Sequence, residues 1–576
     1  MTLLEESAGP SGGPSDDPAG RSPTPEVDFD TDPEHYRHWR YEIDGPTAWV
    51  YLDVAEDGGI APGYELKLNS YDLGVDIELH DLTQRLRFCH PEVRSVVLTS
   101  GRDANFCAGA NIRMLAAASH PWKVNFCKFT NETRNGLEDM TEHGGQTWIA
   151  ALNGTAAGGG YEMALACDRI LLVDDRSSAV SLPEVPLRGV LPGTGGLTRV
   201  IDKRRVRKDR ADVFATRPEG FGGRKAVDWK LVDEAVARRD WDATVRARAA
   251  EAADASSRDP DAVGIAWPPL ERTVTDDALR YDHVRAEIDR GARTATVTVT
   301  LPAGVPDDAA GLHELGAAHP VLALARELDD LILRLRTNEL TIGTWLVRTE
   351  GPVDAALAAD RLLAVEGDWL VDETRRFLTR VLKRLDVTSR SLIALIEPGS
   401  CFAGPLLELA LACDRQYMLE GVFEDADDAD EQAPATLVVT AANLGAHPMG
   451  NGLSRLASRF YGDEDALAAL RERLGEPLTG ADAEEAGLVT DAPDDIDWDD
   501  EIRILVEERA SLSPDALTGM EANHRFVGPE TMETRIFGRL TAWQNWIFIR
   551  PNASGPEGAL RKYGTGRKAD FDRTRV

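Results

Sequence analysis

Asn153-Gly-Thr-Ala-Ala-Gly-Gly-Gly-Tyr-Glu-Met-Ala-Leu-Ala-Cys-Asp-Arg169 is the most informative stretch of this 576-residue chain. It follows Trp148–Leu152, a short apolar run with the length and composition of a buried strand. Gly158–Gly160 then interrupts the pattern, and a helix is predicted to begin near Tyr161. The stretch therefore indicates a strand, a glycine turn and a helix in immediate succession.

The helical part of this stretch occurs twice. Glu162–Arg169 reappears as Glu408–Arg415 with seven of eight positions identical. Three further pairs occur in the same order along the chain: Tyr41–Leu52 with Glu287–Leu301, Thr147–Leu152 with Ser391–Ile396, and Pro192–Arg199 with Pro448–Arg455. Matches in one shared order indicate an internal duplication.

Each half alternates between strand-like and helix-like segments. Val93–Thr99 is short and rich in β-branched residues, whereas apolar residues recur at steps of three and four in Tyr71–Cys89. Such alternation is typical of α/β layers built on a largely parallel sheet. We therefore predict an α/β fold for both halves.

Composition shifts suggest how the chain is divided. Residues 1–35 are rich in Gly, Pro, Ser and acids, which predicts a disordered leader. From about Asp500, apolar and aromatic residues recur at helical spacing, a pattern more typical of core or subunit contacts than of a ligand site. The predicted units are 36–262 with the active site, 278–495 as a degenerate copy, and 496–576 as a C-terminal helical and dimerisation region.

The net charge of −34 argues against binding to nucleic acid or anionic membranes, because both polyanions would be repelled. No apolar run reaches the ~18 residues of a membrane helix, and no signal pattern is present, so we expect a cytoplasmic protein. The six cysteines form no C-x-x-C pair and are expected to be reduced. The eleven histidines show no metal-ligand pattern, so no metal is expected.

Three segments carry a resemblance to a known family. They are Phe106-Cys-Ala-Gly-Ala-Asn-Ile112, Asn153–Glu162, and Pro183-Glu-Val-Pro-Leu-Arg-Gly-Val-Leu-Pro-Gly-Thr-Gly-Gly-Leu-Thr-Arg199. In order and spacing they resemble the crotonase (enoyl-CoA hydratase/isomerase) superfamily. The resemblance implies two tandem crotonase-like ββα-spiral units, the second degenerate, plus a C-terminal helical region. It also implies a coenzyme A thioester as substrate.

The resemblance assigns roles to positions in the first half. The backbone N–H groups of Ala110 and Gly159 match the oxyanion hole, which stabilises negative charge on a thioester oxygen. Glu162 and Glu184 match the glutamates that orient water and transfer protons in the hydratases. The positions that match the coenzyme A site are Ala108, Asn111, Ile112 and Arg113.

Structural alternatives exist for each of these residues. Gly158–Gly160 could make only a tight turn, and Glu162 could only satisfy free amides in the first turn of its own helix. Glu184 could be a solvated loop acid, and Arg113 a plain surface arginine. Gly193-Thr-Gly-Gly196 suggests a phosphate loop, but no G-K-[ST] follows, so we interpret it as a helix-start turn beside the acyl pocket.

The second half departs from the family pattern. Pro405 occupies the position of the oxyanion glycine, and proline has no N–H. Glu408 persists, but the A-G-A segment has no clear counterpart near Thr349–Pro352. We therefore expect a catalytically silent copy that serves packing and dimerisation.

The length, the single competent unit and the segments Val180–Leu187 and Gly558–Val576 resemble a ring-opening branch of the superfamily. That branch acts in aerobic benzoate breakdown. The resemblance implies that 2,3-epoxybenzoyl-CoA is opened with two waters to 3,4-dehydroadipyl-CoA semialdehyde and formate. It implies no metal, flavin or nicotinamide cofactor, and a homo-oligomer, with a dimer favoured. The alternatives are a hydratase or isomerase for another acyl-CoA, and a non-enzymatic CoA-binding protein.

Overall fold

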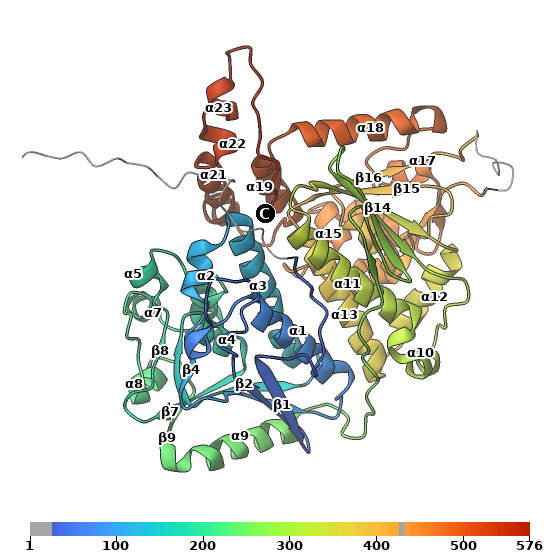
Figure 1. Cartoon of the computed structure of the whole chain (residues 1–576). Coiled ribbons are helices and arrows are strands. Elements are labelled where there is room, and N and C mark those ends of the chain that lie inside the picture. The colour runs from blue at the N-terminus through green and yellow to red at the C-terminus, as the bar shows by residue number, and fades with distance from the viewer. Residues whose placement is uncertain (1–25, 425–431) are drawn as a thin grey trace, which may run out of the picture.

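Two mixed sheets lie side by side in the computed structural model, which describes residues 26–424 and 432–576 (Figure 1). The first sheet has the order β1-β2-β3-β5-β7-β9 and the second β10-β11-β12-β13-β14-β15-β16. Their strands are β1 Trp39–Asp44, β2 Thr47–Leu52, β3 Ser95–Ser100, β5 Thr147–Leu152, β7 Arg169–Asp174, β9 Glu234–Ala237, β10 Thr273–Val274, β11 Ala278–Arg280, β12 Val284–Asp289, β13 Thr294–Thr300, β14 Thr344–Glu350, β15 Ser391–Ile396 and β16 Arg415–Met418.

The two sheets share one pairing pattern. The hairpins β1–β2 and β12–β13 are antiparallel, and each then continues into parallel strands. The repeated segments fall at equivalent places, since Thr147–Leu152 is β5 and Ser391–Ile396 is β15. The predicted alternation of strands and helices is therefore confirmed in both halves.

Helices cover both faces of each sheet. The helices of the first unit are α1 Leu73–Phe88, α2 Ile112–Ala117, α3 His120–Glu142, α4 Gly159–Ala166, α5 Glu184–Arg188, α6 Gly196–Thr198, α7 Lys208–Ala215, α8 Gly223–Asp228 and α9 Trp241–Ala255. Those of the second are α10 Ala309–Leu315, α11 Pro320–Asn338, α12 Val353–Leu363, α13 Trp369–Asp386, α14 Leu407–Leu411, α15 Arg455–Arg459, α16 Glu464–Glu472, α17 Gly480–Glu485 and α18 Asp495–Ser511. Beyond them lie α19 Pro514–Arg525, α20 Met532–Arg535, α21 Thr541–Phe548, α22 Pro551–Ser554 and α23 Ala559–Lys562.

The inner strands β3, β5 and β7 of the first sheet bury side chains on both faces. In β3, Val96 and Leu98 join the large core cluster beneath α1 and α3, while Val97 joins a separate cluster with Trp241 of α9. Figure 1 shows α9 on the opposite side of the sheet from α1 and α3. Two buried faces explain why these strands are continuous apolar runs rather than alternating ones.

One face of the second sheet is covered by α18. Trp498 and Leu505 of α18 pack with Ile393 and Leu395 of β15. The boundary expected at residue 495 is therefore wrong, because it removes the helix that covers this face of the sheet. The second unit extends through α18, and the C-terminal helical region begins after it.

The leader expected at residues 1–35 also needs correction. Val27 and Phe29 are buried in the core of the first unit, and the backbone of Val27 exchanges two hydrogen bonds of 2.9 Å with the side chain of Asn338. Residues 26–35 are thus part of the folded protein, and the composition argument failed because two apolar side chains sufficed to anchor a polar segment. Residues 1–25 lie outside the described residues.

Two helices at the site, α1 and α4, begin at residues other than those predicted. The helix predicted over Tyr71–Cys89 begins at Leu73, after Asp72 accepts a hydrogen bond from the N–H of Gly74 as its N-cap. Tyr71 therefore lies outside the helix and pairs in parallel fashion with Ala110. The helix predicted to begin near Tyr161 begins at Gly159.

Buried ion pairs join the two units along α1, α3, α11 and α13. Glu132 on α3 binds Arg336 at 2.6 Å and also pairs with Arg384, which in turn contacts Asp329. A second group of such contacts connects Arg87 and Asp139 of the first unit with Glu373 and Arg380 of the second. Burial alone would raise the pKa of Glu132, but the two arginines lower it below its usual value. Ion pairs between the units therefore add to those within each unit.

Glu132→Gln tests this interface. The substitution leaves Arg336 and Arg384 without their shared carboxylate, and removal of one partner from a buried ion pair costs about 3–5 kcal/mol. We expect a loss of stability of this order in urea unfolding. Glu142→Gln, at an exposed glutamate at the end of the same helix, serves as the control. Equal midpoints for both variants would contradict the role of the pairs.

Candidate active site

The first structural feature of the site is a close approach of two loops. A small parallel sheet of order β4-β6-β8 (Ala104–Cys107, Gly154–Ala157, Val180–Ser181) ends at one edge, where Ala108–Ala110 meets the first turn of α4. A Cβ on Gly109 would lie 2.7 Å from the amide nitrogen of Gly159, and one on Gly160 would lie 2.5 Å from the carbonyl oxygen of Cys107. Only glycine fits both places, so the turn does more than reverse the chain.

Ala110 and Gly159 both retain a free backbone N–H. Around Ala110, the hydrogen bonds join Tyr71 N–H to Gly109 C=O at 3.1 Å and Asn111 N–H to Tyr71 C=O at 2.9 Å. These bonds use the groups of its neighbours, and within the described residues neither Ala110 N–H nor Gly159 N–H donates to a protein acceptor. Gly159 is also the first residue of α4, where the helix dipole favours negative charge.

Glu162 is buried at 3% exposure and held by the start of another helix. Its Oε1 accepts the N–H groups of Thr194 at 2.9 Å and Gly196 at 2.8 Å, and its Oε2 accepts the hydroxyl of Thr194 at 2.5 Å. The alternative that Glu162 only satisfies its own helix is therefore wrong. The turn at Gly193–Gly196 does begin a helix, α6, as predicted, and it supplies the donors.

Glu184 is buried at 5% exposure, so it is not a solvated loop acid. Its Oε1 accepts one hydrogen bond of 3.3 Å from Arg188, and its buried Oε2 has no partner among the described residues. A Cβ on Gly158 would lie 2.3 Å from Oε1, which places the carboxyl group directly against the glycine turn. Burial, and next the nearby charge of Glu162, raise the pKa of Glu184 to about 7.

The four residues predicted to bind coenzyme A differ in burial and in hydrogen bonding. Asn111 is buried and caps α2, accepting the N–H of Met114 at 3.0 Å and donating to Glu65 C=O at 2.8 Å. Ile112 is 55% exposed and Arg113 is exposed, so both side chains are free to meet a ligand. The N–H of Ala108 is already used by Leu68 C=O at 3.1 Å.

The sequence analysis did not single out three residues that lie directly behind the turn: Tyr71, Arg134 and Asp76. Arg134 on α3 donates to the hydroxyl of Tyr71 at 2.6 Å and to the carbonyl of Gly159 at 3.0 Å. Asp76 on α1 lies nearby and accepts the hydroxyl of Thr130. The helical periodicity of α1 and α3 marks the positions of Asp76 and Arg134 as core-facing. A charged residue at a core-facing position was the signal available in the sequence.

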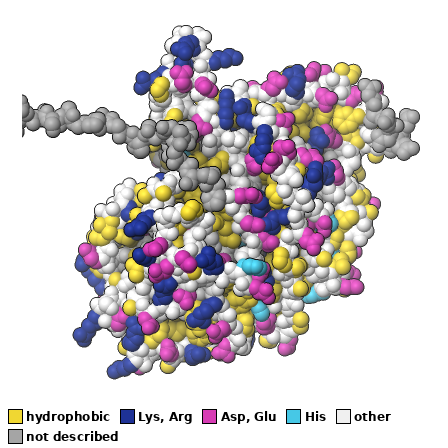
Figure 2. All heavy atoms as spheres, in the orientation of Figure 1, with side chains coloured by type: hydrophobic (Ala, Val, Ile, Leu, Met, Phe, Trp, Pro, Cys, Tyr) yellow, Lys and Arg dark blue, Asp and Glu magenta, His cyan; other side chains and the backbone are white. Residues whose placement is uncertain are grey.

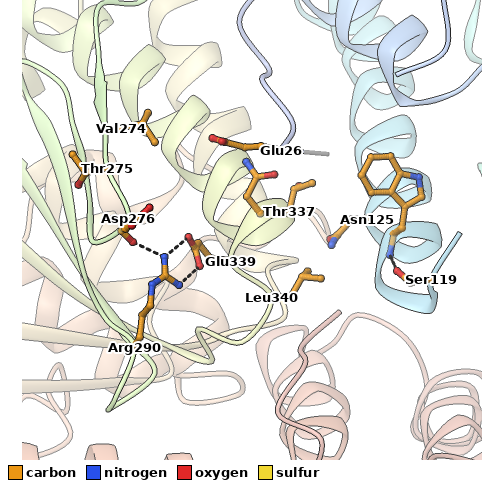
Figure 3. Close-up of a pocket in the computed structure, with 12 residues that line it drawn as sticks. Glu26, Ser119, Asn125, Val274, Thr275, Asp276, Arg290, Thr337, Glu339 and Leu340 are labelled. Carbon is orange, nitrogen blue, oxygen red and sulfur yellow. Dashed lines mark hydrogen bonds and ion pairs between the residues drawn. The ribbon is translucent and has the colours of Figure 1, made fainter. Parts of the chain in front are cut away.

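A separate cavity of about 400 Å³ lies between the units (Figure 3). Figure 3 shows Arg290 pointing to Glu339 and Asp276 on its wall. None of the predicted site residues lines it; its lining is Glu26, Ser119, Trp122, Asn125, Val274, Thr275, Asp276, Arg290, Thr337, Asn338, Glu339 and Leu340. We therefore place the chemistry at the glycine turn and not in this cavity.

Within residues 26–424 and 432–576, no helix combines the length and apolar character needed to cross a bilayer. No group of three or more His, Cys, Asp or Glu side chains in the same ranges is arranged to hold a metal ion. Acidic and basic side chains are intermingled on the face drawn in Figure 2.

The raised pKa of Glu184 makes a prediction about stability. The folded protein keeps the proton up to about pH 7, whereas an unfolded glutamate loses it near about pH 4.3. Ionisation therefore costs stability as the pH rises through this window. Glu184→Gln stays neutral, so its melting temperature relative to the parent should rise between pH 5 and pH 8, as followed by circular dichroism. Glu162→Gln, which loses a well-bonded carboxylate, should instead be less stable than the parent; a pH-independent difference for Glu184→Gln would contradict its raised pKa.

Comparison with known proteins identifies the family of the chain. A family model described as enoyl-CoA hydratase/isomerase matches residues 68–282. The benzoyl-CoA-dihydrodiol lyase of Aromatoleum evansii is 57% identical over 552 residues, which cover 96% of this chain and 98% of that protein. The fatty acid oxidation complex subunit alpha of Aliivibrio fischeri is 30% identical over 27% of this chain and 21% of its own. A solved enoyl-CoA hydratase of Geobacillus kaustophilus covers 39% of this chain and 76% of its own, with 30% identity and a TM-score of 0.34. The chain therefore belongs to the enoyl-CoA hydratase/isomerase (crotonase) superfamily and is a full-length relative of a benzoyl-CoA-dihydrodiol lyase.

Proposed function

We propose that this protein is a benzoyl-CoA-dihydrodiol lyase, also called 2,3-epoxybenzoyl-CoA dihydrolase. It would open the ring of 2,3-epoxybenzoyl-CoA with two waters, giving 3,4-dehydroadipyl-CoA semialdehyde and formate in aerobic benzoate degradation. The observation that carries the proposal is 57% identity to a relative of this name over nearly the full length of both chains.

The free amides of Ala110 and Gly159 would stabilise the thioester oxygen. Negative charge develops on this oxygen when electrons move from the opening ring toward the thioester. Preorganised N–H donors are worth about 3–4 kcal/mol each in such sites. Both amides are unoccupied by protein acceptors, which is the state an oxyanion hole requires before substrate binds.

The environments of the two glutamates suit different tasks. A carboxylate has about four acceptor positions, and Glu162 already uses three of them. The remaining position can orient a water molecule but leaves little freedom to rotate. Glu184 has an unpartnered Oε2 and a pKa raised to about 7, so it can carry a proton in either direction at neutral pH. We assign water orientation to Glu162 and proton transfer to Glu184.

Coenzyme A would lie along the loop from Ala108 to Arg113. The exposed side chains of Leu68 and Ile112 flank this loop and offer apolar surface to the adenine. Arg113, close to Lys67, offers positive charge for a phosphate. The side chain of Asn111 caps α2, so Asn111 contributes by fixing this loop rather than by contacting the ligand. No cofactor beyond the coenzyme A of the substrate is proposed.

The second unit would be silent. Within its described residues it has no counterpart of the β4-β6-β8 sheet, because α12 follows β14 after two residues. Glu408 is buried in an ion pair with Arg455 at 2.9 Å and accepts a hydrogen bond from Asn443 at 2.8 Å. Arg455 also binds Asp386 at 2.8 Å. These contacts occupy both oxygens of Glu408 and give it a structural role.

The C-terminal helical region would make the subunit contact of a dimer. In Figure 1, α21 to α23 project beyond the two sheets. This region exposes large apolar side chains, including Met532, Phe537, Leu540, Phe548 and Ile549. Exposed apolar surface of this kind favours association. A homodimer in the cytoplasm remains the expectation.

The function is tested by incubating the purified protein with 2,3-epoxybenzoyl-CoA and measuring formate. Formate release, with much slower hydration of crotonyl-CoA, is the expected result. Glu162→Gln and Glu184→Gln should each lower kcat by about 100-fold, a typical contribution of general acid–base groups. Hydration of crotonyl-CoA without formate would favour the alternative, an enoyl-CoA hydratase for another acyl-CoA. Near-normal turnover in either variant would remove that glutamate from the mechanism.

Glu408→Gln tests the silence of the second unit. We expect kcat to stay within about twofold of the parent, because no free oxyanion amide lies beside Glu408, while the loss of a buried ion pair lowers the melting temperature. The comparison with Glu162→Gln is direct, since both glutamates occupy the same place in the repeat. A Glu408→Gln protein that is folded but as inactive as Glu162→Gln would show that the second unit takes part in catalysis.

A further inference from the structure

Tyr71 contacts both halves of the candidate oxyanion hole. Its backbone pairs with the loop around Ala110 through two hydrogen bonds, Tyr71 N–H to Gly109 C=O and Asn111 N–H to Tyr71 C=O. Its hydroxyl reaches the other half: a Cβ on Gly159 would lie 2.1 Å from the phenolic oxygen. One residue therefore spans the distance between the two amides that the site needs at a fixed separation.

Arg134 holds the hydroxyl of Tyr71 in this place. The same guanidinium nitrogen, Nη2, donates to the Tyr71 oxygen at 2.6 Å and to the Gly159 carbonyl at 3.0 Å. Nη1 donates to Thr130 C=O at 3.4 Å within α3. Tyr71 and Arg134 are both 1% exposed, so these bonds lie in the interior of the protein. The helix α3 thus determines where the first turn of α4 lies.

The charge of Arg134 is retained in the core by its neighbours. Burial opposes the charge, but the negative charges of Asp76 and Glu162 and the hydrogen bond to Tyr71 raise the pKa of Arg134 above its usual range. Burial likewise keeps the pKa of Tyr71 well above its usual range, so the phenol is a neutral hydroxyl at physiological pH. Asp76 accepts the hydroxyl of Thr130 and supplies the nearby negative charge. A buried cation therefore lies directly behind the amide that faces the thioester.

We propose that Tyr71 and Arg134 are positioning residues of this active site, which hold the amides of Ala110 and Gly159 in register and place a buried positive charge behind the hole. The inference rests on the proposed function. Neither residue belongs to the motifs that define the site, and neither touches the substrate. Their effect is on the electrostatics at the thioester oxygen, where an error of a fraction of an ångström in donor position is costly.

Tyr71→Phe removes one oxygen and keeps the ring. The guanidinium of Arg134 then loses its 2.6 Å bond, and the contact that spaces Gly159 from the loop of Ala110 is gone. We expect kcat to fall by about 10-fold to 100-fold with little change in KM, because misplaced donors weaken transition-state binding more than ground-state binding. Arg134→Lys keeps the charge but loses the guanidinium contact with both Tyr71 and Gly159, so its kcat should fall in the same range.

Tyr161→Phe is the matched control. Tyr161 is a fully buried tyrosine on α4, two residues after Gly159, and its hydroxyl donates to Leu231 C=O at 2.7 Å, away from the turn. Loss of this bond costs stability but leaves Gly159 in place. Tyr161→Phe should therefore match Tyr71→Phe in melting temperature and keep the parental kcat.

The polarisation of a bound thioester separates positioning from folding. Benzoyl-CoA lacks the epoxide and cannot be opened, so its carbonyl stretch can be followed by isotope-edited infrared spectroscopy on the parent and each variant. We expect a shift to lower frequency on the parent, a smaller shift on Tyr71→Phe and Arg134→Lys, and the parental shift on Tyr161→Phe. The parental shift together with parental kcat in Tyr71→Phe would overturn the inference.

The same spectra distinguish the inference from the function on which it rests. If benzoyl-CoA binds to the parent with no carbonyl shift, the oxyanion assignment fails, and with it the need for positioning residues. If the parent shifts the carbonyl and releases formate while Tyr71→Phe does the same, the function stands and the positioning role is wrong. A folded Tyr71→Phe with a reduced shift supports both.

Discussion

The backbone of the loop after β4 contacts the backbone at the first turn of α4, because Gly109 and Gly160 have no Cβ. The site depends on this contact. It brings the amides of Ala110 and Gly159 to one edge of the small β4-β6-β8 sheet and leaves both unpaired. A side chain at either glycine would push the loops apart, and donors that are held apart cannot share one oxygen. The geometry of the candidate oxyanion hole is therefore set by a steric condition on the backbone.

The two carboxyl groups beside this contact show how environment separates similar side chains. Glu162 accepts three hydrogen bonds from Thr194 and Gly196 at the start of α6, which hold its carboxyl group in place. Glu184 is equally buried but keeps one oxygen without a partner, so burial and the charge of Glu162 raise its pKa to about 7. Two carboxyl groups with different hydrogen bonding can thus divide water orientation and proton transfer between them.

The duplicated units use the same framework for different ends. In the first unit, the glycine turn after the repeated strand leaves the N–H of Gly159 unpaired among the described residues. In the second, Gly404–Leu406 forms a 3₁₀ turn in which Pro405 has no N–H. Glu408 keeps its place but binds Arg455, and Arg455 binds Asp386. The second unit adds α11 and α13, whose arginines neutralise Glu132 and other acids of α3. These pairs join α11 and α13 to α3, the helix that carries Arg134.

The sequence by itself determined the framework: the duplication, the strands β5 and β15, the glycine turn, and Glu162, Glu184, Ala110 and Gly159 as candidates. The strands and the glycine turn follow from local pattern, since strand and helix periodicity and glycine spacing are written in consecutive residues. The duplication follows from matches in one shared order, and the four site residues come from the resemblance of their motifs to the crotonase superfamily. Only the tertiary structure decided that α18 completes the second unit and that Val27 and Phe29 are buried, because these depend on packing between distant segments. The same holds for the free oxygen of Glu184, for the Asn111 cap, and for Arg134 reaching Tyr71 and Gly159 from 63 and 25 residues away. Contacts across such separations arise from how helices dock on a sheet, and no local pattern in one sequence encodes them.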